Sequence, residues 1–153
     1  MITVRKGVFE TNSSSVHTIT IDSSGLEKSK LPLGKDHKVI TYFGKFGRDH
    51  CVYQEQSQKL SYLISQLYYC CRIDAIEESY AIEDSYAFQI IEEALIEYIP
   101  GCEGLRIIGV PEPEIDHQSV WKSESRGPVN LYNKESIINF IFNKYVSLTT
   151  DSD

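Results

Sequence analysis

The chain has 153 residues and a mass of 17.5 kDa, which is enough for one domain with a hydrophobic core and too little for two ordinary domains. Apolar residues make up 41% and charged residues 24%, and these values exclude a disordered chain, a collagen and a pure coiled coil. No apolar run approaches the roughly 20 residues of a membrane helix. With no apolar core of a secretory signal near its start, the chain and its four cysteines are typical of a soluble cytoplasmic protein with reduced thiols.

Segments rich in β-branched residues predict strands at 2–4, 16–21 and 38–43. A polar turn over 10–15 separates the first two strands. A loop over 23–34 follows, and Gly44–Arg48 punctuates the third strand as a tight turn.

Apolar residues at a spacing of about 3.6 predict three amphipathic helices. Asp84 or Ser85 is expected to cap the start of the second helix, Pro100–Gly101 to end it, and Asn133 to cap the third. The apolar faces of the three helices are Leu60, Leu63, Ile64, Leu67 and Cys71; Ala87, Ile90, Ile91, Ala94, Leu95 and Tyr98; and Ile137, Ile138, Ile141, Phe142 and Tyr145.

A buried strand is predicted over 105–110, and short edge strands are predicted at Trp121 and at 129–132. The polar tail, 149–153, is expected to fray. Together these elements predict a single α+β domain over 1–153, in which a small antiparallel sheet packs with about three amphipathic helices.

The net charge of -7 is unevenly distributed along the chain. Residues 1–72 carry ten bases and six acids, whereas residues 73–105 carry nine acids and no base. One interpretation is a solvated helix face. The other is a nucleic-acid mimic, in which carboxylates and interleaved tyrosines occupy a basic groove that normally holds DNA or RNA. The predicted partner-binding residues are Asp74, Glu77, Glu78, Tyr80, Glu83, Asp84, Tyr86, Glu92, Glu93 and Glu97, with Glu103 and Tyr98 nearby in the sequence.

Two polar clusters could carry chemistry. Asn12, Ser13, Ser14 and Ser15 precede a strand and could bind an anion, and alternation along the strand places His17 on its apolar face. Asp116 and His117 could form an acid–base pair, or bind a metal if His17 came close. In each case the alternative is a hydrogen-bonded structural role.

The Gly44–Arg48 segment could also hold a phosphate through Lys45 and Arg48, although it lacks the spacing of a phosphate-binding loop. The cysteines show no Cys-x-x-Cys pair, so no metal site is predicted. No cofactor motif stands out, so we expect no cofactor.

Short segments of this chain resemble a set of proteins from Firmicutes bacteria and their phages to which no activity is assigned. They are Gly7–His17, with the pattern Phe-Glu-Thr-Asn-Ser-Ser-Ser-x-His, then Phe43–Gly47, Lys59–Leu63, Ile115–Ser119 and Asn139–Asn143. The resemblance implies a mobile-element setting, where small acidic proteins often resemble inhibitors of host defence, including anti-CRISPR proteins. It implies a location in the cytoplasm of the host cell.

Two functions follow from these observations. The first is a phage inhibitor that binds a host nucleic-acid-handling protein, such as a CRISPR effector, through its acidic region. The second is a phosphoester- or RNA-processing enzyme with a pocket of Ser13–Ser15, His17, Asp116 and His117. The net charge argues against direct nucleic-acid binding, and residues 1–72 are the part of the chain that could provide it. We expect no membrane partner.

Overall fold

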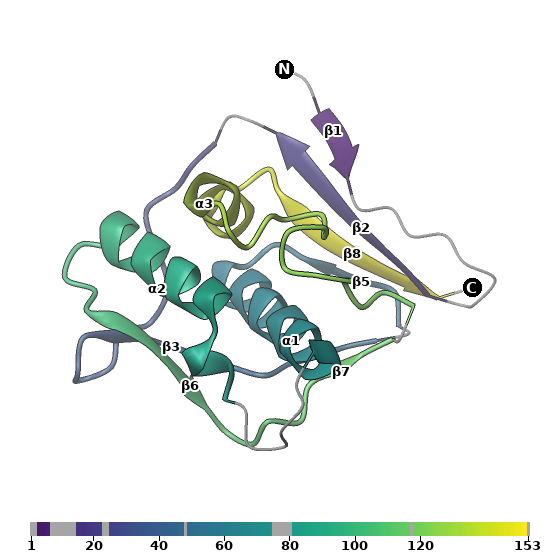
Figure 1. Cartoon of the computed structure of the whole chain (residues 1–153). Coiled ribbons are helices and arrows are strands. Elements are labelled where there is room, and N and C mark those ends of the chain that lie inside the picture. The colour runs from purple at the N-terminus through teal and green to yellow at the C-terminus, as the bar shows by residue number, and fades with distance from the viewer. Residues whose placement is uncertain are drawn as a thin grey trace.

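A computed structural model describes residues 3–6, 15–22, 25–47, 49–74, 81–116 and 118–152. The described elements form an α+β fold of three α-helices with small sheets, as the sequence predicted (Figure 1). They are β1 (Thr3–Lys6), β2 (Ser15–Asp22), β3 (Lys38–Tyr42), β4 (Lys45–Phe46), β5 (Cys51–Tyr53), α1 (Gln56–Asp74), the 3-10 helix η1 (Ile82–Asp84), α2 (Tyr86–Tyr98), β6 (Gly104–Ile108), β7 (Glu114–Ile115), α3 (Lys134–Phe142) and β8 (Ser147–Ser152).

The largest sheet is antiparallel, with the strand order β1-β2-β8-β5. Its inner strand β8 pairs with β2 on one side and with β5 on the other. Two further strand pairs, β3 with β6 and β4 with β7, are parallel. Parallel strands need a long crossover connection. The segment that connects β3 to β6 includes helices α1 and α2.

Helix α1 lies at the centre of the molecule, in contact with α2, α3, β3 and β7 (Figure 1). The predicted apolar stripe is buried, and so is every residue from 59 to 67. The polar residues among them have partners, since Ser61 Oγ donates to the carbonyl of Tyr42 and Gln66 Oε1 accepts from the N–H of Trp121. The helix is therefore enclosed on all sides over this stretch rather than amphipathic.

Helices α2 and α3 begin at predicted caps. The Ser85 hydroxyl accepts from the N–H of Phe88 at 3.1 Å, and Asn133 Oδ1 accepts from the N–H of Ser136 at 3.0 Å. The ends of the two helices meet where Tyr98 stacks on Phe142, with ring centroids 4.2 Å apart. Local sequence signals therefore located both helices correctly.

Three predictions about local structure are wrong. Trp121 and residues 129–132 form no strand, and Trp121 instead packs 1% exposed against the Tyr62 ring. Lys45 and Phe46 form strand β4 rather than a tight turn, because β7 supplies a partner strand. Residues 149–152 do not fray; they belong to the inner strand β8, where Thr150 is 1% exposed.

Candidate functional site

The acidic region of the sequence divides in the fold. Asp74 is the last residue of α1, but its side chain, together with Glu77, Glu78 and Tyr80, lies outside the described residues. Glu83 and Asp84 are exposed on η1, directly before α2. The remaining acids, Glu92, Glu93, Glu97 and Glu103, lie on α2 or between α2 and β6.

An exposed stripe runs along α2 through Tyr86, Glu93 and Glu97. These positions are seven and eleven residues from Tyr86, so helical geometry places them on one face. Tyr86 is 64% exposed, and its ring centroid lies 5.6 Å from that of Tyr132. Tyr132 is 43% exposed and comes just before α3. We call these residues, together with Lys134 at the start of α3, the α2–α3 face.

Lys134 neutralises part of this face. Its Nζ lies 3.2 Å from a Glu93 carboxylate oxygen and 2.7 Å from one of Glu97. Glu124 adds a further carboxylate beside Tyr132, where burial and that negative charge raise the pKa of the tyrosine. The face therefore combines two exposed rings with a carboxylate cluster that one lysine compensates only in part.

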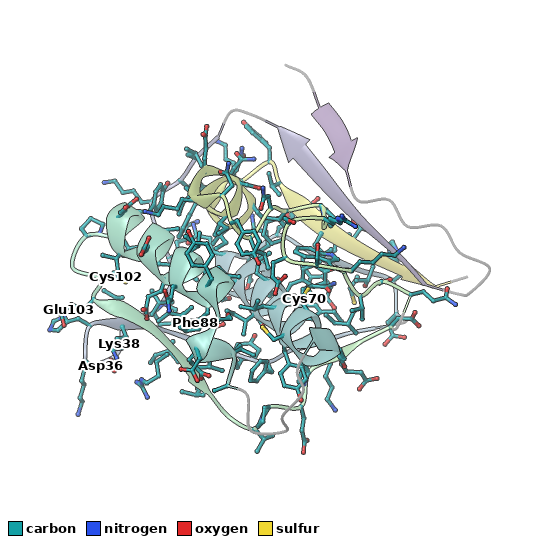
Figure 2. The ribbon with its side chains drawn as sticks, viewed as in Figure 1. Asp36, Lys38, Cys70, Phe88, Cys102 and Glu103 are labelled. Carbon is teal, nitrogen blue, oxygen red and sulfur yellow. The ribbon has the colours of Figure 1, made fainter. Side chains whose placement is uncertain are left out.

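Three residues of the predicted set or its flanks point elsewhere. Glu92 Oε2 accepts from the N–H of Leu105 at 3.0 Å, so this carboxylate completes the hydrogen bonding of β6. Tyr98 donates its hydroxyl to the Glu27 carbonyl and is half-buried. Glu103 lies beside Lys38 and Asp36, where β3 and β6 begin together (Figure 2).

The serine–histidine motif lies mostly beyond what the structure describes. Asn12, Ser13 and Ser14 are outside the described residues, and only the backbone of Ser15 and His17 is described, in β2. His117 is also outside them. The Asp116 carboxylate accepts from the N–H of Gln118 at 3.0 Å, as an ordinary turn residue does. The pocket required by the enzyme hypothesis, in which His17 and His117 lie close together, therefore stays a prediction.

Lys45 is exposed on β4, with its Nζ 3.9 Å from a Glu114 carboxylate oxygen, and Arg48 is outside the described residues. The four cysteines all lie in the described residues as thiols outside any disulfide, and Cys70, Cys71 and Cys102 are buried. In the described ranges no cluster of three or more His, Cys, Asp or Glu residues could hold a metal ion.

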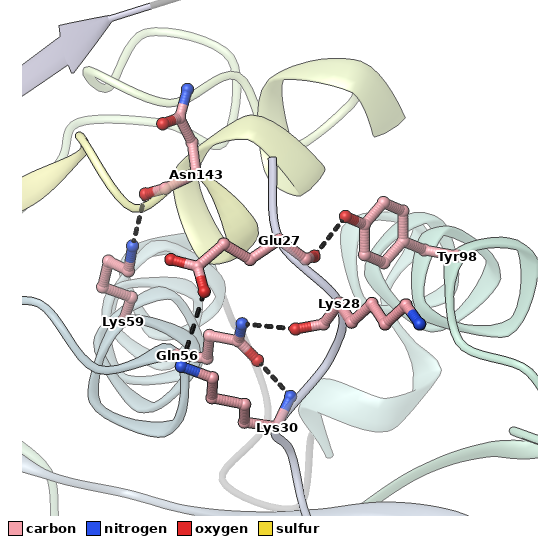
Figure 3. Close-up of polar contacts among 7 residues, drawn as sticks. All are labelled: Glu27, Lys28, Lys30, Gln56, Lys59, Tyr98 and Asn143. Carbon is pink, nitrogen blue, oxygen red and sulfur yellow. Dashed lines mark hydrogen bonds and ion pairs between the residues drawn. The ribbon is translucent and has the colours of Figure 1, made fainter. Parts of the chain in front are cut away.

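Lys59 carries a buried charge that was not predicted from the sequence, since its side chain is 1% exposed. Its Nζ donates to the carbonyls of Asn143 and Val146, each at 3.1 Å, directly after α3 ends (Figure 3). A cation is favourable there, because the last carbonyls of a helix carry partial negative charge. One sequence feature could have indicated this burial: on the helical wheel Lys59 lies ~40° from Leu63, at the border of the apolar stripe.

Lys59 lies under an extended segment, residues 25–33, which we call the strap. Gln56 holds the strap at two points, since its Oε1 accepts from the N–H of Lys30 at 2.6 Å and its Nε2 donates to the Lys28 carbonyl at 3.0 Å (Figure 3). The strap begins at Gly25, whose φ of +116° favours glycine. The Gly25 carbonyl accepts a hydrogen bond from the backbone N–H of Lys144. These contacts fix the strap between α1 and the end of α3.

A cleft of about 430 Å³ opens between the strap, the start of α1 and the end of α3. Its wall includes Lys30, Lys59 and Lys144, with Glu27 and Glu55 as acids and Phe142 as part of its apolar lining. Burial lowers the pKa of Lys59 to about 8, and the charge of Glu27 acts in the opposite direction. A buried ionisable group beside a cleft marks a candidate ligand site.

Comparison with known proteins identifies no relative of this chain. No protein-family model, curated protein or solved structure matches the chain. Within the described residues, no helix is long and apolar enough to cross a membrane. The α2–α3 face and the cleft are the candidate sites among the described residues.

Proposed function

We propose that this protein acts by binding another protein through the α2–α3 face, as a phage or mobile-element inhibitor of a host nuclease that holds nucleic acid in a basic groove. A CRISPR effector is the proposed target class. The protein would occupy the groove and exclude DNA or RNA from it. This proposal takes up the first of the two functions that the charge pattern and the family resemblance suggest.

The observation that carries the proposal is the exposed Tyr86–Tyr132 pair. The two ring centroids lie 5.6 Å apart, and Tyr86 is 64% exposed. Both rings are therefore available to a partner. Tyrosine buries a large area at low entropic cost and is enriched among the residues that dominate binding energy. Such a pair is therefore a suitable anchor at the centre of an interface.

The charge around this pair supports a basic partner. Glu124 lies beside the Tyr132 ring, and Glu83 and Asp84 directly precede α2. Glu93 and Glu97 lie further along the same face of α2, where Lys134 neutralises part of their charge. Carboxylates on the same face as an aromatic anchor steer a basic surface toward it and make association sensitive to salt. The half-neutralised cluster predicts moderate rather than steep salt dependence.

The test measures DNA cleavage by a purified, guide-loaded CRISPR effector from a Firmicutes host as this protein is added. We expect inhibition that Tyr86→Ala with Tyr132→Ala weakens about tenfold or more, because such anchors supply much of an interface's binding energy. Tyr42→Ala is the matched control, since Tyr42 is 46% exposed on β3, outside the α2–α3 face. It should inhibit as the wild type does.

A second pair of variants separates the charge from the rings. Glu83→Lys with Asp84→Lys should weaken inhibition and flatten its salt dependence. The control, Glu112→Lys with Glu114→Lys, makes the same change of charge at two exposed residues just before and at the start of β7 and should inhibit as the wild type does. Circular dichroism checks that each variant is folded. If the wild type leaves cleavage unchanged, or if all variants inhibit equally, the proposal is wrong.

A further inference from the structure

A second hollow lies between the strap and the end of α2, which we call the strap groove. The strap separates it from Lys59, which is on the α1 side (Figure 3). Its volume of about 630 Å³ is within the usual range for small-molecule sites. It shares no lining residue with the α2–α3 face. Most of its lining is apolar, namely Leu26, Leu31, Leu33, Tyr98, Ile99 and Pro100.

The apolar lining of the strap groove is accessible to a ligand. Leu26 is 55% exposed, Leu33 is 38% exposed, and Pro100 is also exposed. The Tyr98 ring stacks on Phe142 but remains only half-buried, and it lines the groove. An apolar ligand would therefore cover side chains that otherwise contact water, and removing apolar surface from water favours binding.

Hydrogen bonds hold both walls of the strap groove in place. The Tyr98 hydroxyl donates to the Glu27 carbonyl and joins the end of α2 to the strap (Figure 3). On the opposite side of the strap, Gln56 Nε2 donates to the Lys28 carbonyl. Because these contacts exist without a ligand, binding would require little further ordering of the chain.

The charges in the lining of the strap groove do not cancel. Its charged side chains are those of Glu27 and Lys28, and the Glu27 carboxylate lies 3.4 Å from Lys30 Nζ as an ion pair. Lys28 is exposed and forms no ion pair with another described residue. Its side chain extends toward the α2 side of the strap (Figure 3). One positive charge is therefore left over at the rim, which favours a ligand with a single negative charge.

We propose that the strap groove binds a small single-chain amphiphile with one carboxylate group, of the size of a medium-chain fatty acid. The alkyl chain packs on Leu26, Leu33 and Pro100 and covers the half-buried ring of Tyr98. The carboxylate lies at the rim, where the Lys28 ammonium compensates its charge. This site goes beyond the proposed inhibitor role and does not depend on it.

The test is a titration of the whole ¹⁵N-labelled chain, followed by NMR, with octanoate, 1-octanol and acetate as separate probes. We expect octanoate to cause saturable shifts of the amides of residues 26–31 and 98–99. Acetate keeps the carboxylate but lacks the alkyl chain, so it should bind about tenfold or more weakly, because buried methylene groups supply most of the affinity. 1-Octanol keeps the chain without the charge and should bind several-fold more weakly than octanoate.

Variants of the full chain locate the bound amphiphile. Leu26→Ser and Lys28→Gln should each weaken octanoate binding several-fold without disturbing the core, because both side chains are exposed. The matched controls, Val110→Ser and Lys122→Gln, change exposed residues outside the groove and should bind as the wild type does. Shifts that do not saturate, equal affinity for octanoate and either other probe, or unchanged binding by Leu26→Ser or by Lys28→Gln would overturn the proposal.

Discussion

At the scale of single residues, Lys59 is the group whose environment departs furthest from what its residue type suggests. A lysine normally keeps its charge in water, but here the Nζ is enclosed and bonded to two carbonyls. The amine joins α1 to the end of α3 and the start of β8. It therefore has a structural role whether or not the cleft binds a ligand.

This environment predicts how stability varies with pH. The pKa of Lys59 is about 8 in the folded chain, against an ordinary value of 10.5. Below pH 8 both the folded and the unfolded state hold the proton, so the free energy of unfolding does not depend on this group. From pH 8 to 10.5 the unfolded state binds more protons, so stability rises with pH, by up to about 1.4 kcal/mol per pH unit.

The measurement is urea unfolding of the wild type and of Lys59→Met at pH 7, 8, 9 and 10. The wild type should gain stability relative to the variant only above pH 8. The range ends at pH 10 because burial raises the pKa of Tyr62, which makes stability fall at higher pH. A difference between the two proteins that stays constant over this range would contradict the assignment.

At the scale of elements, the ends of the helices are set by local hydrogen bonds. Asn133 lies in an extended conformation before α3, and its Oδ1 satisfies the N–H of Ser136. Such a cap supplies a partner for a donor that the helix itself cannot pair. Lys59 performs the corresponding function for the Asn143 carbonyl at the other end of the same helix.

Asn133→Ala should lower the free energy of unfolding by about 1 kcal/mol, because the Ser136 N–H loses its acceptor. Asn133→Ser keeps a side-chain oxygen at the cap and should remain close to the wild type. Thermal and urea unfolding of the three proteins compare these values. Equal losses in both variants would show that the side-chain oxygen is not what stabilises the start of α3.

At the scale of the whole molecule, the fold is closed by its last strand. β8 lies between β2 and β5, and Leu148 is fully buried. Because an inner strand provides hydrogen bonds on both sides, its loss exposes two edges and part of the core at once. The C-terminal segment is therefore needed for the sheet that contains β2, the strand carrying His17.

A chain that ends at Val146 should lose the cooperative unfolding transition of the full-length protein, because β2 and β5 would have no partner strand between them. A chain that ends at Ser152 keeps all of β8 and is the control. Chemical denaturation followed by tryptophan fluorescence reports on the buried Trp121. A sharp, native-like transition in the shorter chain would show that the sheet does not depend on β8.

Sequence patterns predicted the elements whose signals are local. The apolar spacing of 60–71, 87–98 and 137–145 located all three helices, and β-branched runs located β1, β2, β3 and β6 to within a few residues. Two of the wrong predictions share one cause. Residues 45–46 and 149–152 are polar or short in sequence, and they became strands because distant partners pair with them.

The functional candidates divide in the same way. Counting charges found the acidic region, but the count could not tell that Glu92 bonds to Leu105 while Glu93 and Glu97 share Lys134. The Tyr86–Tyr132 contact joins residues 46 positions apart in the sequence. No local sequence motif predicts the Tyr86–Tyr132 contact or the cleft around Lys59.

By itself, the sequence determined the fold class, the helices with their caps, and the excess of acid between residues 73 and 105. Those properties depend on neighbours within one or two helical turns, which spacing and composition record directly. The tertiary structure decided which carboxylates remain exposed, which tyrosines meet and where a lysine is buried. These depend on contacts between segments far apart in the chain, because burial and charge compensation are set by whatever packs alongside each side chain.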